Sequence, residues 1–385
     1  MDTVGNDARF RSFRRRKEGC VNIRSAEDTT GFGPVERLES IMRLDSRSAR
    51  ELSDLESVIL GAQLSDDDEL EFRARAQWTV TSNVHPRPQS VRIQNLEWCL
   101  RWIDAHRSRV HDSCLVKVLW DMKARIQEMS LDPSTPMTRV HAMLDDYRRH
   151  LEATGRSMES LHALRMQLDI EIGAVDSAQR EQALRDASPR DDLSDCTACQ
   201  VTGDLRLDLI GQRYVEAADR ARAFISGHDH RCPNQPHEAQ AASLHVLTRV
   251  GDEKTARRHA LDCWSVLVDK RANPVSAGTA IHWAAWSGAI ERALMMIDEY
   301  LPGFDDTRAQ LPGYRIYLLA GSAYALERAV AAGLGRHPLN AGTVAALAQQ
   351  WSDEARDIAA AFDRRNRTPT ATLRIEEMLH LPPLR

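Results

Sequence analysis

The chain has 385 residues and a formal net charge of −5, with charged residues making up 28% and aromatic residues 5% of the sequence. A chain of this length can bury a large core, and the nearly balanced charge excludes a general attraction to nucleic acid or anionic lipid. Ala, Leu, Arg, Glu and Asp dominate, and β-branched runs are scarce. This usage is typical of helices, so we expect an all-α fold.

Residues 1–33 show no sustained apolar period, and we expect them to form a disordered basic arm. Arg9–Lys17 places six positive charges in nine residues, interrupted by Phe10 and Phe13. Such a segment can contact phosphates and stack on bases, which keeps nucleic acid as an alternative partner. The sequence has no apolar stretch near the ~20 residues that span a bilayer and no apolar signal-peptide core, so we expect a cytoplasmic protein without membrane contact.

Residues 34–135 form a predicted N-terminal helical region. The apolar period indicates helices near 35–43, 48–63, 67–82, 90–106 and 110–129. Ser65 is the expected N-cap of the third helix, because the acidic residues 66–69 follow it. Trp98, Trp102 and Trp120 are expected to contribute to the core.

Residues 136–370 repeat a helix, a glycine and a second helix that carries an alanine five or six positions on. After a first stop at Gly155, the turn glycines are Gly173, Gly211, Gly251 and Gly288, spaced by 38, 40 and 37 residues. Glycine can adopt the left-handed conformation that ends a helix, and stacked pairs of this kind bury one another's apolar faces. We predict a right-handed α-solenoid of degenerate tetratricopeptide-like repeats, followed by a C-terminal capping helix and tail at 371–385.

One stretch favours a different repeat. The segment 278–298 matches the ankyrin signature at Thr279, His282, Ala284, Ala285 and Gly288. The match occurs once, and no turn signal recurs at 33 residues. The flanking units fit the helix pair better.

The seven cysteines include a C-x-x-C pair, Cys196 and Cys199, followed by Cys232 and His237 in "RCPNQPH". Counted back from Gly211 and Gly251, all four residues fall at the starts of two neighbouring first helices. Three thiolates and an imidazole suit tetrahedral zinc, and a helix N-terminus lowers the pKa of a thiol. Since four protein ligands leave no open position, we predict a structural zinc ion between adjacent repeats.

Other interpretations of these residues remain open. The C-x-x-C pair can be a redox pair or two small buried residues, and His228 or His230 can replace His237 as the ligand. The sequence contains no phosphate-binding loop, dinucleotide fingerprint, zinc-protease or nucleophile-elbow motif. We therefore expect no catalytic residues and a protein that is not an enzyme.

From about residue 90 onward, the chain resembles uncharacterised bacterial tetratricopeptide-repeat proteins of the actinobacterial type. The resemblance rests on the Trp-rich segment, "DDLSDCTAC" at 191–199, "RCPNQPH" at 231–237, and the close "AAAFDRRNRT" at 359–368. It implies the repeat fold and the cysteine and histidine block, and no reaction.

The leading functional hypothesis is a non-enzymatic scaffold that binds a peptide or partner protein in a concave groove. If Leu205 and Leu209 pack inward, Arg206 and Asp208 should point into that groove. The alternative is a nucleic-acid-associated or regulatory protein that uses the basic arm.

Overall fold

A computed structural model describes residues 33–43, 49–83, 87–225, 232, 234–270, 273–301 and 310–384. The basic arm with Arg9–Lys17 lies outside these residues, as do His228 and His230.

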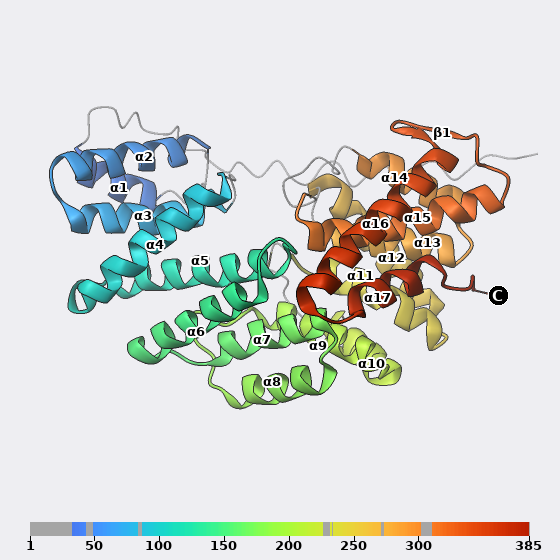
Figure 1. The fold of residues 1–385 in the computed structure, drawn as a ribbon, viewed down its shortest axis with the longest axis horizontal. Coiled ribbons are helices and arrows are strands. Elements are labelled where there is room, and N and C mark those ends of the chain that lie inside the picture. The colour runs from blue at the N-terminus through green and yellow to red at the C-terminus, as the bar shows by residue number, and fades with distance from the viewer. Residues whose placement is uncertain are drawn as a thin grey trace, which may run out of the picture. The chain divides into compact units, whose positions relative to one another are not determined.

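Helices account for nearly all regular structure in the described ranges, which confirms the all-α prediction (Figure 1). The helices are α1 (Pro34–Arg43), α2 (Ala49–Leu64), α3 (Asp68–Ser82), α4 (Gln89–Ala105), η2 (Arg107–Arg109, a 3-10 helix), α5 (Asp112–Ser130), α6 (Met137–Thr154), α7 (Glu159–Ile172), α8 (Val175–Ala187), α9 (Thr197–Ile210), α10 (Tyr214–Ile225), α11 (His237–Arg249), α12 (Glu253–Lys270), α13 (Pro274–Trp286), α14 (Ile290–Tyr300), α15 (Pro312–Ala331), α16 (Val344–Asn366) and α17 (Thr370–Leu379). Two short strands, β1 (Pro338–Leu339) and β2 (Gly342–Thr343), pair antiparallel before α16.

The chain divides into two compact units, Met1–His85 and Pro86–Arg385. The first contains α1 to α3, whose core includes Leu38, Leu55 and Trp78. The predicted boundaries at 33/34, 135/136 and 370/371 follow repeat membership, which this division by compactness does not test. The cap of α3 differs from the sequence-based expectation: Asp67, not Ser65, accepts from the backbone N–H of Leu70, at 3.0 Å.

In the second unit, helices pack as consecutive pairs: α7 with α8, α9 with α10, α11 with α12, and α13 with α14. The first helices α7, α9, α11 and α13 also pack on one another in that order, and α13 packs on α15. Gly173, Gly251 and Gly288 have positive φ angles, as predicted for the turns. Between α9 and α10 the prediction was wrong: Gln212 takes the positive φ of 57°, and Gly211 has φ −79°.

The second helices α12 and α14 bury their apolar faces, as expected for stacked helix pairs. Ala256, Cys263, Trp264 and Leu267 on α12 are buried, and so are the corresponding residues of α14: Ala293, Met296, Ile297 and Tyr300. Trp102 lies in the core as expected, whereas Trp98 is half-buried and Trp120 is 37% exposed, so the core prediction for Trp120 was wrong.

The last helices of the unit return to its beginning. Arg365 on α16 donates to the carbonyls of Ser130 and Asp132 at the end of α5, each at 2.9 Å. Arg374 on α17 donates to Tyr317 Oη at 2.8 Å and to Glu171 Oε2 at 3.3 Å, which ties α17 to α15 and α7. The contacts with α5 and α7 join segments that are more than 200 residues apart in the sequence.

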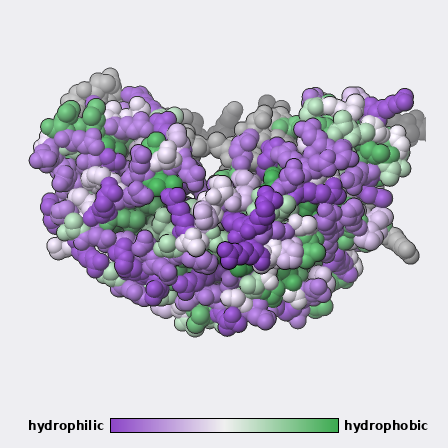
Figure 2. All heavy atoms as spheres, in the orientation of Figure 1, coloured by the Kyte–Doolittle hydropathy of each residue, from purple (hydrophilic) through white to green (hydrophobic). Residues whose placement is uncertain are grey.

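The face of the molecule in Figure 2 is mainly hydrophilic, and hydrophobic residues on it are scattered. This face therefore has no broad apolar patch over the described residues. Among the helices of the described ranges, none is both long enough and apolar enough to cross a membrane.

Candidate metal centre

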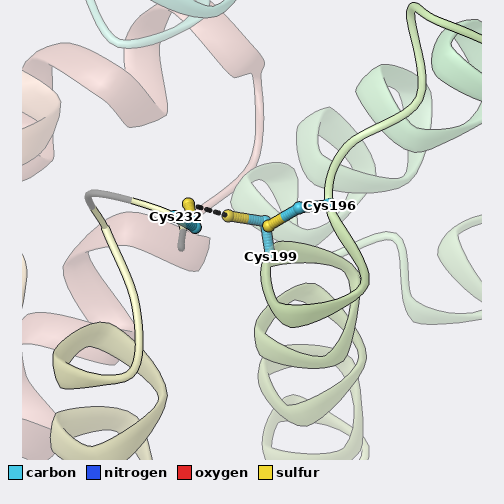
Figure 3. Close-up of side chains that lie close together, drawn as sticks. All are labelled: Cys196, Cys199 and Cys232. Carbon is cyan, nitrogen blue, oxygen red and sulfur yellow. Dashed lines mark hydrogen bonds between the residues drawn. The ribbon is translucent and has the colours of Figure 1, made fainter. Parts of the chain in front are cut away.

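Two of the predicted ligands lie at the start of α9. Cys196 occupies the N-cap position with extended backbone, and Cys199 follows in the first turn. Their spacing of three places both thiols on the side of α9 that faces the segment before α11, where Cys232 lies (Figure 3). Cys196 is exposed, and the other two are half-buried.

A buried amide holds the two helix starts together. Gln235 Nε2 donates to Thr202 Oγ1 on α9 at 3.0 Å, and Gln235 Oε1 accepts from the backbone N–H of Ala239 on α11 at 3.2 Å. Ala198 and Ala239 pack against each other beside this bridge. The small side chains let α9 and α11 approach closely, so Cys232 is brought to Cys199 by packing as well as by any bound ion.

The sulfur atoms of Cys196, Cys199 and Cys232 all lie within 4.8 Å of one another, and these cysteines form no disulfide. The Sγ atoms of Cys199 and Cys232 are 3.7 Å apart. Sulfurs bound to one tetrahedral zinc ion at ~2.3 Å lie about 3.8 Å apart, because the edge of a tetrahedron is about 1.6 times the centre-to-corner distance. The three thiols can therefore hold a metal ion.

His237 is the first residue of α11 and is only 1% exposed. Its ring nitrogens are not part of the group of ligand atoms that lie within 4.8 Å of one another. Its assignment as the fourth ligand stays a prediction.

Burial raises the pKa of the Cys199 thiol well above its usual range, and negative charge on Cys232 and Cys196 raises it further. Burial also raises the pKa of Cys232, against a hydrogen bond from the backbone N–H of Asn234 that lowers it. The expectation that the helix N-terminus would make these thiols acidic was therefore wrong for Cys199 and Cys232. Three thiolates repel one another at this distance, so their charged state requires a cation among them.

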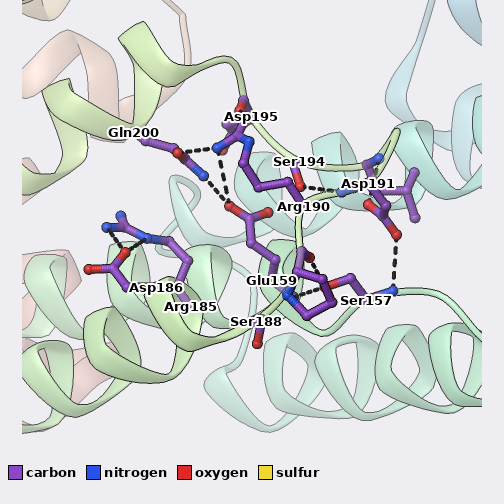
Figure 4. A network of polar contacts seen from close by, with 12 residues as sticks. Ser157, Glu159, Arg185, Asp186, Ser188, Arg190, Asp191, Ser194, Asp195 and Gln200 are labelled. Carbon is purple, nitrogen blue, oxygen red and sulfur yellow. Dashed lines mark hydrogen bonds and ion pairs between the residues drawn. The ribbon is translucent and has the colours of Figure 1, made fainter.

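A polar network fixes the loop that leads into Cys196 (Figure 4). Asp191 accepts from the backbone N–H groups of Ser157 at 3.0 Å and Leu193 at 2.9 Å. The hydroxyl of Ser194 accepts from the N–H of Asp191 at 3.0 Å. The acidic residue thus closes a turn and ties it to the start of α7.

The same network reaches the first turn of α9. Arg190 donates to the carbonyl of Asp195 and to Gln200 Oε1, and Gln200 Nε2 donates to Glu159 Oε1 (Figure 4). Glu159 is 1% exposed at the first position of α7. The orientation of the α9 start, and with it that of the cysteines, is therefore set from outside the cysteine cluster.

Sequence reasoning missed Lys123, which holds the loop before Cys196 in place. Lys123 on α5 is 1% exposed, and its Nζ donates to Asp195 Oδ1 at 2.7 Å and to the carbonyl of Leu193 at 3.3 Å. Trp120, one turn earlier, donates from Nε1 to the carbonyl of Asp192 at 2.8 Å. A signal existed, since a lysine at an apolar position of a helix needs a partner.

The expected groove residues behave differently from one another. Asp208 is 2% exposed and pairs with Arg213 at 2.6 Å and Arg220 at 2.9 Å, so the prediction that it points into a groove was wrong. A buried carboxylate is stable only when it is paired, and the turn and α10 supply its partners. Arg206 is half-buried, and its place in a groove stays a prediction. Burial raises the pKa of Tyr317 on α15, and the charge of Arg374, with a smaller effect of Arg206, opposes this rise.

No protein-family model, curated protein or solved structure matches this chain. The resemblance to bacterial tetratricopeptide-repeat proteins accordingly stays an expectation from the sequence.

Proposed function

We propose that this protein is a non-enzymatic cytoplasmic scaffold, a right-handed solenoid of tetratricopeptide-like helix pairs that binds a protein or peptide partner. A structural zinc ion fastens two of its first helices, α9 and α11. Cys196, Cys199 and Cys232 hold the ion, and His237 is the predicted fourth ligand. The observation that carries the proposal is the convergence of three thiols from two successive helix pairs.

A zinc ion in this position supplies cohesion between repeats. It neutralises thiolates that otherwise repel one another, and it links the start of α9 to the start of α11. A set of four protein ligands leaves no position for water or substrate, which is why we assign the ion a structural role.

The successive packing of α7, α9, α11, α13 and α15 supports the scaffold assignment. A row of first helices offers a surface along which an extended segment can bind. The alternative of nucleic-acid binding depends on Arg9–Lys17, outside the described residues. Deletion of residues 1–33 separates the two, since a scaffold keeps its partner and arm-driven binding loses its salt-sensitive affinity.

The metal is tested by elemental mass spectrometry of the chain purified without added zinc. We expect about one zinc ion per chain, lost in the Cys196→Ser, Cys199→Ser variant together with thermal stability. At a free zinc concentration of 100 times the dissociation constant, the ion stabilises the fold by roughly 2.7 kcal/mol.

Cys263→Ser is the matched control, because Cys263 is fully buried on α12 and lies outside the cluster. It should lower the melting temperature and leave the zinc content unchanged. His237→Gln tests the fourth ligand: unchanged zinc affinity would remove His237 from the set. A metal-free wild-type chain that melts like the cysteine variant would contradict the clamp, leaving a redox pair or buried thiols.

A further inference from the structure

Three ring side chains from two neighbouring helices lie side by side in the second unit, each at most 4% exposed beneath the end of the chain. His282 and Trp286 lie on α13, and Tyr324 lies on α15. The rings of His282 and Tyr324 stack with centroids 4.3 Å apart. We refer to His282, Trp286 and Tyr324 as the aromatic platform.

His245 on α11 contacts two of the three platform rings. Its ring lies 5.3 Å from that of Trp286, and its Nε2 lies 2.8 Å from Nδ1 of His282. Because His282 Nε2 must donate to a carbonyl on its other side, its Nδ1 accepts the proton of His245 Nε2. The imidazole of His282 is thereby held in the tautomer that carries its proton on Nε2, which is directed toward α17.

The platform donates hydrogen bonds to backbone carbonyls only. His282 Nε2 donates to the carbonyl of Met378 at 2.9 Å, and Trp286 Nε1 donates to that of Pro382 at 2.8 Å.

Tyr324 Oη donates to the carbonyl of Leu381 at 3.0 Å. The carbonyl of Trp286 accepts in return from the N–H of Leu384 at 3.1 Å. The segment His380–Leu384, which we call the tail segment, is thus held by its backbone, and its Pro382, Pro383 and Leu384 side chains are exposed.

Recognition through backbone carbonyls suits an extended, proline-containing ligand. Residues 381–384 have no regular secondary structure, and Pro382 and Pro383 have no N–H to satisfy. Proline presets the extended polyproline conformation, so such a ligand loses little entropy on binding. Grooves that bind polyproline segments are lined by aromatic side chains of this kind.

The tail segment can leave Trp286 and Tyr324 without undocking α17, because the bond of His282 to Met378 lies on α17 itself. The helix is held separately, through the buried side chains of Ile375 and Leu379 and the hydrogen bonds of Arg374. Within the tail segment Leu381 is half-buried against the core, whereas Pro382, Pro383 and Leu384 are exposed, Leu384 to 39%. Segments with few buried apolar contacts open at low free-energy cost.

We propose that the aromatic platform is a binding site for an extended, proline-containing segment of a partner protein, and that the tail segment occupies it as an internal ligand that the partner displaces. This inference rests on the scaffold function proposed above and specifies the class of partner. It does not depend on the metal centre.

The test uses a fluorescein-labelled synthetic peptide, MLHLPPL, which copies residues 378–384, and measures binding by fluorescence anisotropy. In one variant of the full chain, a Gly-Ser sequence replaces His380–Leu384. We expect saturable binding to this variant and at least roughly ten-fold weaker binding to the wild-type chain, in which the internal segment competes. Equal affinity for both chains, or no saturable binding to the variant, overturns the proposal.

A second substitution locates the peptide on the platform. Trp286→Phe, made in the tail-replaced chain, removes the indole donor and keeps the ring, so we expect roughly ten-fold weaker binding. Trp264→Phe is the matched control, because the indole of Trp264 donates to Glu299 on α14 at 2.8 Å and not to a carbonyl of the tail segment. The control should bind like its parent, and an equal loss in both variants overturns the assignment.

The peptide MLHLGGL tests the role of the prolines and should bind more weakly than MLHLPPL; equal binding contradicts a proline-specific site. If the tail replacement unfolds the chain, the double variant Pro382→Gly, Pro383→Gly loosens the segment with all backbone carbonyls retained and takes its place. Zinc content and melting temperature are measured on the same samples. If the peptide fails to bind a chain that is folded and contains zinc, the platform proposal is wrong and the metal proposal is unaffected. If the folded chain contains no zinc, the metal proposal is wrong and the platform proposal is unaffected.

Discussion

The platform depends on an unusually close approach of α13 and α15, and that approach yields a quantitative prediction. Gly278 on α13 faces the backbone of α15. A Cβ at Gly278 would lie 2.7 Å from the Cα of Leu318 and 2.8 Å from the carbonyl carbon of Tyr317, and closer still to the Tyr317 oxygen. Gly321 meets the backbone of Gly278 in the same way from the other side.

We therefore predict that Gly278→Ala destabilises the second unit. Carbon atoms in contact lie about 3.5–4.0 Å apart, so the helices must separate by about 1 Å. Overpacking of a core costs up to about 3 kcal/mol, and alanine returns about 1 kcal/mol of helix propensity. The net loss of about 2 kcal/mol corresponds to a fall in melting temperature of roughly 4–8 °C.

The assay is thermal unfolding followed by circular dichroism at 222 nm, with Gly203→Ala as the control. Gly203 lies inside α9, and a Cβ there would meet only the flexible end of Met166, at 3.1 Å. Because Met166 can move aside, the helix propensity of alanine should leave the melting temperature unchanged or raise it by a few degrees, about 1 kcal/mol in stability. If Gly278→Ala melts at or above the wild-type temperature, the backbone contact between α13 and α15 does not exist.

Three further substitutions test other parts of the second unit. Lys123→Met removes the buried partner of Asp195, so zinc should pass to a chelator roughly ten-fold faster at unchanged stoichiometry; an unchanged rate would contradict the anchoring role of Lys123. Asp208→Asn should cost about 2 kcal/mol in urea unfolding, because two arginines lose a buried carboxylate, whereas Asp219→Asn on the exposed face should change stability by less than about 0.5 kcal/mol. Burial lowers the pKa of His282 from 6.5 to about 4. Between these two pH values His282 is protonated in the unfolded chain and neutral in the folded chain, so the free energy of unfolding falls as the pH drops from 6.5 toward 4. His282→Gln cannot titrate, and its stability loss between pH 6.5 and 4 should be smaller by roughly 3 kcal/mol; equal slopes in urea unfolding would contradict this.

Local sequence signals predicted the helices between residues 35 and 129 to within about two residues at each end, and the left-handed turns at Gly173, Gly251 and Gly288. The apolar face of α12 and the positive φ angles at Gly173, Gly251 and Gly288 depend on residues within one or two helical turns, so the local sequence is enough to predict them. The error between α9 and α10 was one of register. The N–H of Arg213 bonds to the carbonyl of Asp208, so the left-handed position falls on Gln212, one residue after the glycine.

The sequence predicted the cysteine cluster but not the contacts from other helices that fix its position. Spacing from the turn glycines placed Cys196, Cys199 and Cys232 at two neighbouring helix starts, and the thiols do converge. The support from Lys123 was hidden because it joins residues 72 positions apart, and no local period reports such a pair. The burial of Asp208 was missed for a related reason, since its arginine partners on the turn and α10 determine which way α9 faces.

The return of α16 and α17 changes how the helix pairs cooperate. In a simple solenoid each pair contacts only its neighbours, and stability is a sum of local terms. Here Arg365 on α16 donates to a carbonyl at the end of α5, and Arg374 joins α17 to α7. The last helices of this unit therefore stabilise α5 and α7, near its beginning, by direct contact. A change at either end of this unit is therefore felt at the other. Since α17 also carries the segment that covers the aromatic platform, the displacement proposed above would take place next to a helix that Arg374 ties to α7 and α15.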